Sequence, residues 1–155
     1  MHADFQLLVI RRATRDGDPW SGHMGLPGGH RHEEDRDDRA TAERETLEEL
    51  GVDLASNAEF IGQLDDIQAS AHGQTVDLVI SCFVFLVGAS PSLVLNDEVA
   101  ETLWVSLTSL RNGELSQTHE VSFQGQPRKL PCWRAEGRVI WGLTYRIVSN
   151  LLHEL

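Results

Sequence analysis

The stretch LPGGHRHEEDRDDRATAERETLEELGV, residues 26–52, decides the fold class of this 155-residue chain. It opens with a Pro–Gly–Gly turn, and the residues from Asp35 to Leu50 then predict a helix. Aspartates stand where that helix should begin, and Gly51 stands where it should end. We therefore expect a glycine-rich turn that leads into a helix.

Three glutamates of this helix should lie on one face. At about 100° per residue, Glu45, Glu48 and Glu49 fall within one sector of the helical wheel. Their negative charges repel one another, and Arg44 offsets part of the repulsion by pairing with Glu48 four residues on. A divalent cation would turn the repulsion into attraction, and oxygen ligands suit Mg²⁺ or Mn²⁺. The alternative is a solvated acidic face.

The spacing of these residues resembles the Nudix box. Five residues separate Gly29 from Asp35, and residues 44–52 fit the pattern Arg-Glu-x-x-Glu-Glu-x-Gly followed by an apolar residue. The resemblance implies an α/β protein, an α/β/α sandwich around a mixed β-sheet with the box helix and a C-terminal helix. It also implies a metal-dependent pyrophosphohydrolase that cleaves a nucleoside diphosphate linked to a further group X.

The resemblance also assigns expected roles to individual residues. The metal ligands would be the carbonyl of Gly28 and the carboxylates of Glu45, Glu48, Glu49 and Glu98. The catalytic residues would be Arg44, Glu45, Glu48 and Glu98, with Asp35 pairing with Arg44. One of the three acidic catalytic residues would take a proton from the attacking water, and the sequence does not rank them. Asp97 is a substitute for Glu98, and a solvated loop acid is the alternative.

Substrate contacts are expected from Arg11, Arg12 and Gly29. The two arginines follow a predicted strand near the glycine turn, so we expect one of them to contact a substrate phosphate. A surface salt bridge is the alternative. His30 and His32 follow the turn and could face the metal, although exposed loop histidines are the simpler interpretation. The tryptophans at positions 20 and 141 either stack on a base or pack under the loop.

Three segments resemble the coenzyme A pyrophosphatase-like branch of the family. They are RRATRDGDPWSGHMGLPGG at residues 11–29, ATAERET at residues 40–46 and VIWGLTYRIVSNLL at residues 139–152. Other nucleotide substrates remain open: ADP-ribose-like compounds, dinucleotides and nucleoside triphosphates. A non-catalytic ligand-sensing domain and an isomerase on the same fold are further alternatives. A Ca²⁺-binding module is disfavoured because the acids lie on a predicted helix and not in a 12-residue loop.

The charge and composition restrict the partners. The chain has 24 acidic and 13 basic residues and a net charge of -11, which disfavours nucleic acid and anionic membranes. No apolar run reaches about 20 residues, and we expect no secretion signal because no basic segment followed by an apolar core stands at residues 1–5. We therefore expect a cytoplasmic protein of one domain, residues 1–155, with two reduced cysteines and a small nucleotide diphosphate substrate.

The remaining pattern predicts the other elements. They are strands at Phe5–Ile10, Phe60–Leu64, Val76–Val87 and Glu98–Leu107, a loop at Ala13–Gly29, a short helix or loop at Leu110–Gln117, a hairpin at Glu120–Leu130 and a helix at Arg138–Leu155. The nearly continuous apolar sequence of residues 76–87 is typical of a central strand covered on both faces. On the box helix, Leu47, Leu50 and Ala40 lie opposite the glutamates, so we expect that side to face the core. Little sequence precedes the first strand, and the sheet edge that this leaves favours a homodimer.

Overall fold

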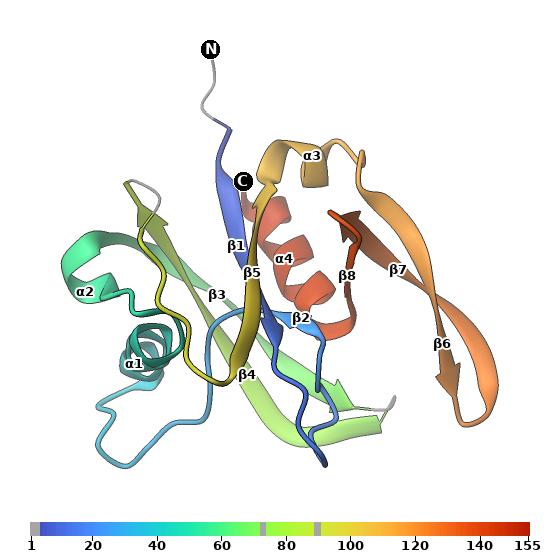
Figure 1. Cartoon of the computed structure of the whole chain (residues 1–155), viewed down its shortest axis with the longest axis horizontal. Helices are drawn as coiled ribbons and strands as arrows, with labels where there is room; N and C mark the ends of the chain where they lie inside the picture. Colours follow the sequence, from blue (N-terminus) through green and yellow to red (C-terminus); the bar gives the residue numbers. More distant parts are fainter. Residues whose placement is uncertain (1–3, 72–73, 89–90) are drawn as a thin grey trace.

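The fold is organised around a three-stranded sheet in the order β2–β1–β5, which the computed structural model shows at the centre of the molecule (Figure 1). The structure describes residues 4–71, 74–88 and 91–155. The strands are β1 (Gln6–Arg12), β2 (Met24–Gly25) and β5 (Val99–Ser106), and both pairings are antiparallel. The strands expected at residues 5–10 and 98–107 are therefore confirmed, and β1 continues through the arginine pair.

Strand β1 is buried on both faces. Side chains alternate along a strand, so Val9 and Ile10 point to opposite sides of the sheet, and they are 0% and 1% exposed. Val9 belongs to a hydrophobic cluster with Val148 of the C-terminal helix, while Ile10 belongs to a second cluster with Leu50 of the box helix. The sheet thus separates two cores, each completed by a helix, in the layered arrangement that was expected.

Two further sheets and four helices complete the described part of the chain. One sheet pairs β3 (Ala58–Ala71) with β4 (Gln74–Val87), and the other has the order β6 (Ser116–Phe123), β7 (Gln126–Ala135) and β8 (Arg138–Trp141). All the described strand pairs are antiparallel. The helices are α1 (Asp38–Leu50), α2 (Leu54–Asn57), α3 (Leu107–Arg111) and α4 (Gly142–Glu154). The β6–β7 hairpin projects from the body of the molecule (Figure 1). No helix in the described ranges is long and apolar enough to span a bilayer.

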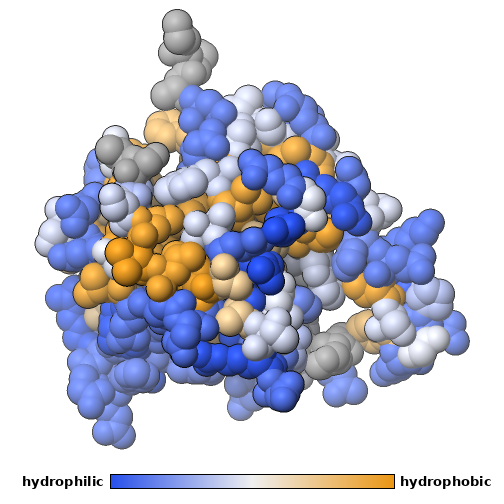
Figure 2. Space-filling model, viewed as in Figure 1, coloured by the Kyte–Doolittle hydropathy of each residue, from blue (hydrophilic) through white to orange (hydrophobic). Residues whose placement is uncertain are grey.

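The prediction of a central strand at residues 76–87 is wrong. In the described part of the chain, β4 pairs only with β3, and none of its side chains is fully buried. Val79 and Leu86 are 56% and 38% exposed, and apolar side chains reach the surface on the face shown in Figure 2. A continuous apolar run indicates that a strand is hydrophobic, but it does not indicate how many strands pair with it. The strand that is covered on both faces is β1.

Several element boundaries also differ from expectation. The C-terminal helix was predicted from Arg138, but Arg138–Trp141 forms β8 and the helix begins at Gly142, because this apolar stretch pairs with β7. The hairpin turn at Gln124–Gly125 is confirmed, with strands longer than predicted. The short strand expected at residues 60–64 is 14 residues long, and α3 begins three residues before the helix or loop expected at 110–117 and ends within that range.

Glu101 joins three strands through ion pairs. It lies directly opposite Arg11 in the β1–β5 pairing, with 3.0 Å between its Oε1 and the Arg11 Nε. Arg138 of β8 also pairs with it, with 2.9 Å between Nη2 and Oε2. These guanidinium groups, Arg138 first, lower the pKa of Glu101 from its ordinary 4.5 to about 2. The Glu101 carboxylate therefore stabilises the folded protein only while it is ionised.

Glu101→Gln should make the stability of the protein less dependent on pH. Because the folded-state pKa is lowered, the contribution of Glu101 is complete above about 4.5 and is lost as the pH falls towards about 2. The urea midpoint of the variant should lie below that of the wild type at pH 6, and the difference should close between pH 4.5 and 2. Glu59→Gln, at an exposed position, is the control. A constant difference across this range would contradict the prediction.

Candidate active site

Helix α1 turns two of its glutamates towards the interior of the protein. Glu45 and Glu49 are 9% and 2% exposed, whereas Leu47 is 49% exposed. Leu50 is fully buried, as expected, but the prediction that Leu47 faces the core is wrong. The buried side of this helix carries polar residues as well as Leu50, because it faces a loop in addition to the apolar cluster that contains Ile10. This loop carries Gly28 and Gly29 (Gly28 donates to Glu49).

The ends of α1 are set by local chemistry. The helix begins at Asp38 and not at Asp35, because the side chain of Asp37 caps it and accepts a hydrogen bond from the Ala40 N–H at 2.8 Å. Gly51 ends the helix, as predicted, with φ of +70° and its N–H donating to the Leu47 carbonyl. Asp35 therefore lies before the helix, where its carboxylate can pair with the side chain of another residue.

Arg44 is the partner of Asp35, and together they form a clamp between the loop and the helix. The Arg44 Nε and Nη2 donate to the two carboxylate oxygens of Asp35 at 3.0 and 2.9 Å. Asp35 is 8% exposed and also accepts from the His32 N–H and the Thr41 hydroxyl. The Arg44 hydrogen bonds hold the pKa of Asp35 well below its usual range. This bidentate pair stays ionised at neutral pH and fixes the orientation of the guanidinium group.

The same guanidinium group holds the first two glutamates of the box. Arg44 Nη1 donates to Glu45 at 3.0 Å and to Glu48 at 3.2 Å, and Nη2 donates to the His30 carbonyl at 3.0 Å. The side chain of Glu48 is 52% exposed. A Cβ at Gly29 would overlap the Glu45 carboxylate, so only glycine leaves room for it. Gly29 and the Glu45 carboxylate are therefore in close contact.

Glu49 is the most deeply buried carboxylate of the helix. Its Oε2 accepts a hydrogen bond from the Gly28 N–H at 3.0 Å. Burial, reinforced by the negative charges of Glu45 and Glu98, raises the pKa of Glu49 to about 7, while the Gly28 hydrogen bond and the charge of Arg12 act in the opposite direction. A positive charge placed beside Glu49 would favour its ionised form.

Glu98 reaches the site from the loop before β5. This loop is attached to the end of α1, since the Asn96 N–H donates to the Glu49 carbonyl at 3.1 Å. The Glu98 carbonyl accepts from the Ala13 N–H at 2.8 Å, and its half-exposed carboxylate lies 3.4 Å from Arg15 Nη1. Asp97, the proposed substitute, is 90% exposed and lies 3.6 Å from Arg15. Of the two acids, Glu98 is the one whose charge raises the pKa of Glu49.

The two arginines after the first strand have different surroundings. Arg11 pairs with Glu101, as described above. Arg12 pairs with Asp18 at 2.9 Å, lines a hollow together with Gly28, Gly29 and Glu45, and its positive charge acts on the pKa of Glu49. Because neighbouring residues of a strand point to opposite faces, only Arg12 is directed to the site. Both arginines form ion pairs, so the salt-bridge alternative describes the structure as it stands.

The donor set fits a hard divalent cation. It consists of carboxylate oxygens, one of them buried among like charges, beside a turn with no side chain to obstruct it. Within the described ranges, no three or more His, Cys, Asp or Glu side chains converge into a group that could hold a metal ion. Arg44 draws Glu45 and Glu48 to itself, and Gly28 holds Glu49. The roles predicted for Gly28, Glu45, Glu48, Glu49 and Glu98 therefore remain predictions.

The sequence did not predict the ion pairs that residues outside the Nudix box form around the site. Arg12 with Asp18 and Arg15 with Glu98 are brought together by the path of the 13–25 loop, and no local spacing signals them. His30 and His32 are exposed, which agrees with the simpler interpretation. The ring of Trp141 packs against the histidine rings at positions 23 and 119, with centroids 5.2 and 5.1 Å away. This packing matches the structural alternative for Trp141.

Comparison with known families gives one match that covers most of the chain. The NUDIX domain model matches residues 2–124. An uncharacterized Nudix hydrolase of Photorhabdus laumondii, NudL, is 28% identical over 152 residues, which are 96% of this chain and 76% of that protein. An uncharacterized protein of Schizosaccharomyces pombe is 48% identical over 107 residues, which are 67% of this chain and 32% of that protein. The chain thus spans about a third of the length of the yeast relative.

Solved structures share the fold. A Caenorhabditis elegans Ap4A hydrolase, solved as a binary complex, gives a TM-score of 0.55 at 16% identity, over 69% of this chain and 72% of that one. A MutT/nudix family protein from Enterococcus faecalis gives 0.54 at 17% identity, over 96% of this chain and 54% of that one. These likenesses confirm the expected fold class.

Gly29→Ala should weaken the binding of Mn²⁺ to the protein. The added Cβ would displace the Glu45 carboxylate, and disturbing groups around a metal site lowers affinity by roughly 10- to 100-fold. Calorimetric titration with Mn²⁺ measures the effect. Gly25→Ala is the matched control, because a Cβ there would make only ordinary contacts of 3.9 Å with Arg12. Equal affinities for the two folded variants would rule out the close fit of Gly29 and Glu45 as a metal-binding feature.

Proposed function

Because this chain belongs to the NUDIX domain family, we propose that it is a metal-dependent pyrophosphohydrolase that cleaves a nucleoside diphosphate linked to a further group X. The observation that carries the proposal is the buried Glu49, held by the Gly28 N–H beside Glu45 and Glu98. A buried carboxylate among like charges is poorly stabilised by protein alone and well stabilised by a cation. All three box glutamates are present, which favours hydrolysis over ligand sensing.

We propose Mg²⁺ or Mn²⁺ as the cofactor, held by the carboxylates of Glu45, Glu48, Glu49 and Glu98 and the carbonyl of Gly28. Such a cation would neutralise phosphate oxygens and lower the pKa of water. The side chains of the protein would orient the ligands and accept the proton. The clamp of Arg44 and Asp35 holds Glu45 and Glu48, and the Glu45 carboxylate lies beside Gly29. Glu98 is the favoured proton acceptor because it lies outside the Arg44 ion pairs and is half exposed to solvent.

We propose a coenzyme A-like substrate, on the three sequence segments described above. ADP-ribose-like compounds, dinucleotides and nucleoside triphosphates are the alternatives. A cytoplasmic location, a single domain and a homodimer stay predictions, and a monomeric mass in solution would contradict the last of these.

A substrate screen tests the activity. Coenzyme A, ADP-ribose, NADH, diadenosine polyphosphates and nucleoside triphosphates are incubated with Mg²⁺ and with Mn²⁺, and the released phosphates are measured. Glu49→Gln should lower kcat by about 100-fold or more, because it removes a charged ligand from the cation. Glu43→Gln is the control on the same helix, since Glu43 pairs with Arg39 at 2.9 Å. Its kcat should stay within about twofold of the wild type.

Each outcome of the screen has a definite meaning. Cleavage of coenzyme A, with Glu49→Gln inactive, supports both the mechanism and the branch. Preference for another diphosphate keeps the mechanism and shows the branch to be wrong. If the folded wild type cleaves none of these compounds, the hydrolase proposal fails and a ligand-sensing domain takes its place.

Arg12→Ala should raise KM for the best substrate of this screen, and Arg11→Ala should leave it unchanged. The reason is that Arg12 lines the hollow beside Gly28 and Arg11 is paired with Glu101 away from it. Loss of one charge-assisted contact to phosphate corresponds to an increase in KM of about tenfold. Steady-state kinetics of the two variants, matched by circular dichroism, provide the comparison. An unchanged KM for Arg12→Ala would remove this residue from the substrate site.

A further inference from the structure

The C-terminal segment, β8 with α4, contacts the loop that carries the glycine turn. The family match ends at residue 124, so this segment lies beyond it. Two residues at the junction of β8 and α4 make the contact. Trp141 ends the strand, and Thr144 is in the first turn of the helix. Neither has a role in the hydrolysis mechanism proposed above.

Thr144 donates a buried hydrogen bond to the loop. Its hydroxyl lies 2.9 Å from the carbonyl oxygen of Met24, and the two residues are 9% and 5% exposed. Buried carbonyl oxygens in proteins almost always have a partner, since an unpaired one loses its hydrogen bond to water without replacement. Replacing the hydroxyl by a methyl group would leave this bond to the carbonyl unmade with almost no change in volume.

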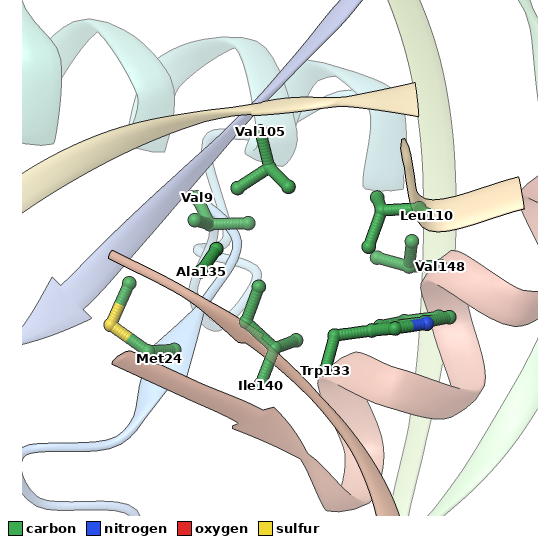
Figure 3. Close-up of a cluster of buried hydrophobic side chains, with 8 residues drawn as sticks. All are labelled: Val9, Met24, Val105, Leu110, Trp133, Ala135, Ile140 and Val148. Carbon is green, nitrogen blue, oxygen red and sulfur yellow. The ribbon is translucent and has the colours of Figure 1, made fainter. Parts of the chain in front are cut away.

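Met24 is also held by its side chain and by its backbone neighbours. Its side chain lies in the hydrophobic cluster with Ile140 of β8 and Val148 of α4 (Figure 3). In the sheet, Met24 pairs with Arg11 of β1. One residue before it, the ring of His23 packs on Trp141, and the His23 carbonyl accepts from the Arg12 N–H at 3.0 Å. The C-terminal segment therefore holds residues 23 and 24 by three kinds of contact.

Only three residues separate Met24 from Gly28, whose N–H binds Glu49. Gly29 follows, with no room for even a Cβ against Glu45. Met24 is therefore close in sequence to the two glycines that contact Glu45 and Glu49. We infer that Thr144 is a positioning residue, which fixes Met24 and through it the turn of Gly28 and Gly29 against Glu45 and Glu49. Its catalytic consequence rests on the function proposed above.

Hydrogen exchange tests the positioning without reference to activity. Exchange is measured by mass spectrometry on peptides that cover residues 22–30 in the wild type and in three variants. In Thr144→Val these amides should exchange about tenfold faster, the effect of one lost hydrogen bond on local opening. Thr144→Ser keeps the hydroxyl and should restore slow exchange. Ser149→Ala removes a hydroxyl from the same helix outside this cluster and should not accelerate the loop.

Kinetics with Mg²⁺ and coenzyme A or ADP-ribose, whichever is cleaved, give the second readout. Thr144→Val should lower kcat several-fold with KM within about twofold, and Thr144→Ser should recover it. Exchange and kcat at wild-type levels in Thr144→Val would overturn the inference, as would an equal effect in Ser149→Ala. If the wild type cleaves neither compound, the proposed function fails, and the exchange data still decide whether Thr144 positions the loop. Should Thr144→Val not fold, Thr144→Ala, which also lacks the hydroxyl, is compared with Thr144→Ser, and equal loop exchange in these two variants would also overturn the inference.

Discussion

The hydrogen bond from the Gly28 N–H to the Glu49 carboxylate is the contact around which the candidate site is assembled. Removing a carboxylate from water costs several kcal/mol, and one hydrogen bond to a charged group returns only about 1.5–3 kcal/mol. The pKa of about 7 is the result of this imbalance. The backbone of the same residue holds the loop before β5, so Glu49 connects the glycine turn, the helix and the loop that carries Glu98.

Strand β1 explains how one short segment serves both cores and also the site. Its alternation sends Val9 to one cluster and Ile10 to the other, and the same alternation gives the two following arginines different partners. Arg11 faces Glu101 across the sheet, where it contributes to the joining of strands. Arg12 is past a register shift in the pairing, and it faces Asp18 and the hollow. Two adjacent arginines therefore have different partners on different sides of the strand.

The sequence predicted those features that depend on local chemistry. Gly51 ends its helix because glycine adopts a positive φ, and the hairpin turns at Gln124–Gly125 for a comparable local reason. The pairing of Arg44 with Asp35 followed from the resemblance. Features that depend on the path of the chain were not predictable. The apolar run in β4 could not indicate that it has one neighbouring strand, and the helical wheel of α1 could not indicate that its acidic side faces inwards while Leu47 faces solvent.

The first hydrophobic cluster combines residues from both sides of position 124. Val9, Met24, Val105 and Leu110 come from the part that matches the family, while Trp133, Ala135, Ile140 and Val148 come from the part beyond it (Figure 3). A polypeptide truncated at the family boundary would thus expose half of an apolar interior to water, and exposed apolar surface of this kind promotes aggregation. The last 31 residues thus supply four of the eight buried residues of this cluster, and recombinant fragments of this protein should retain them.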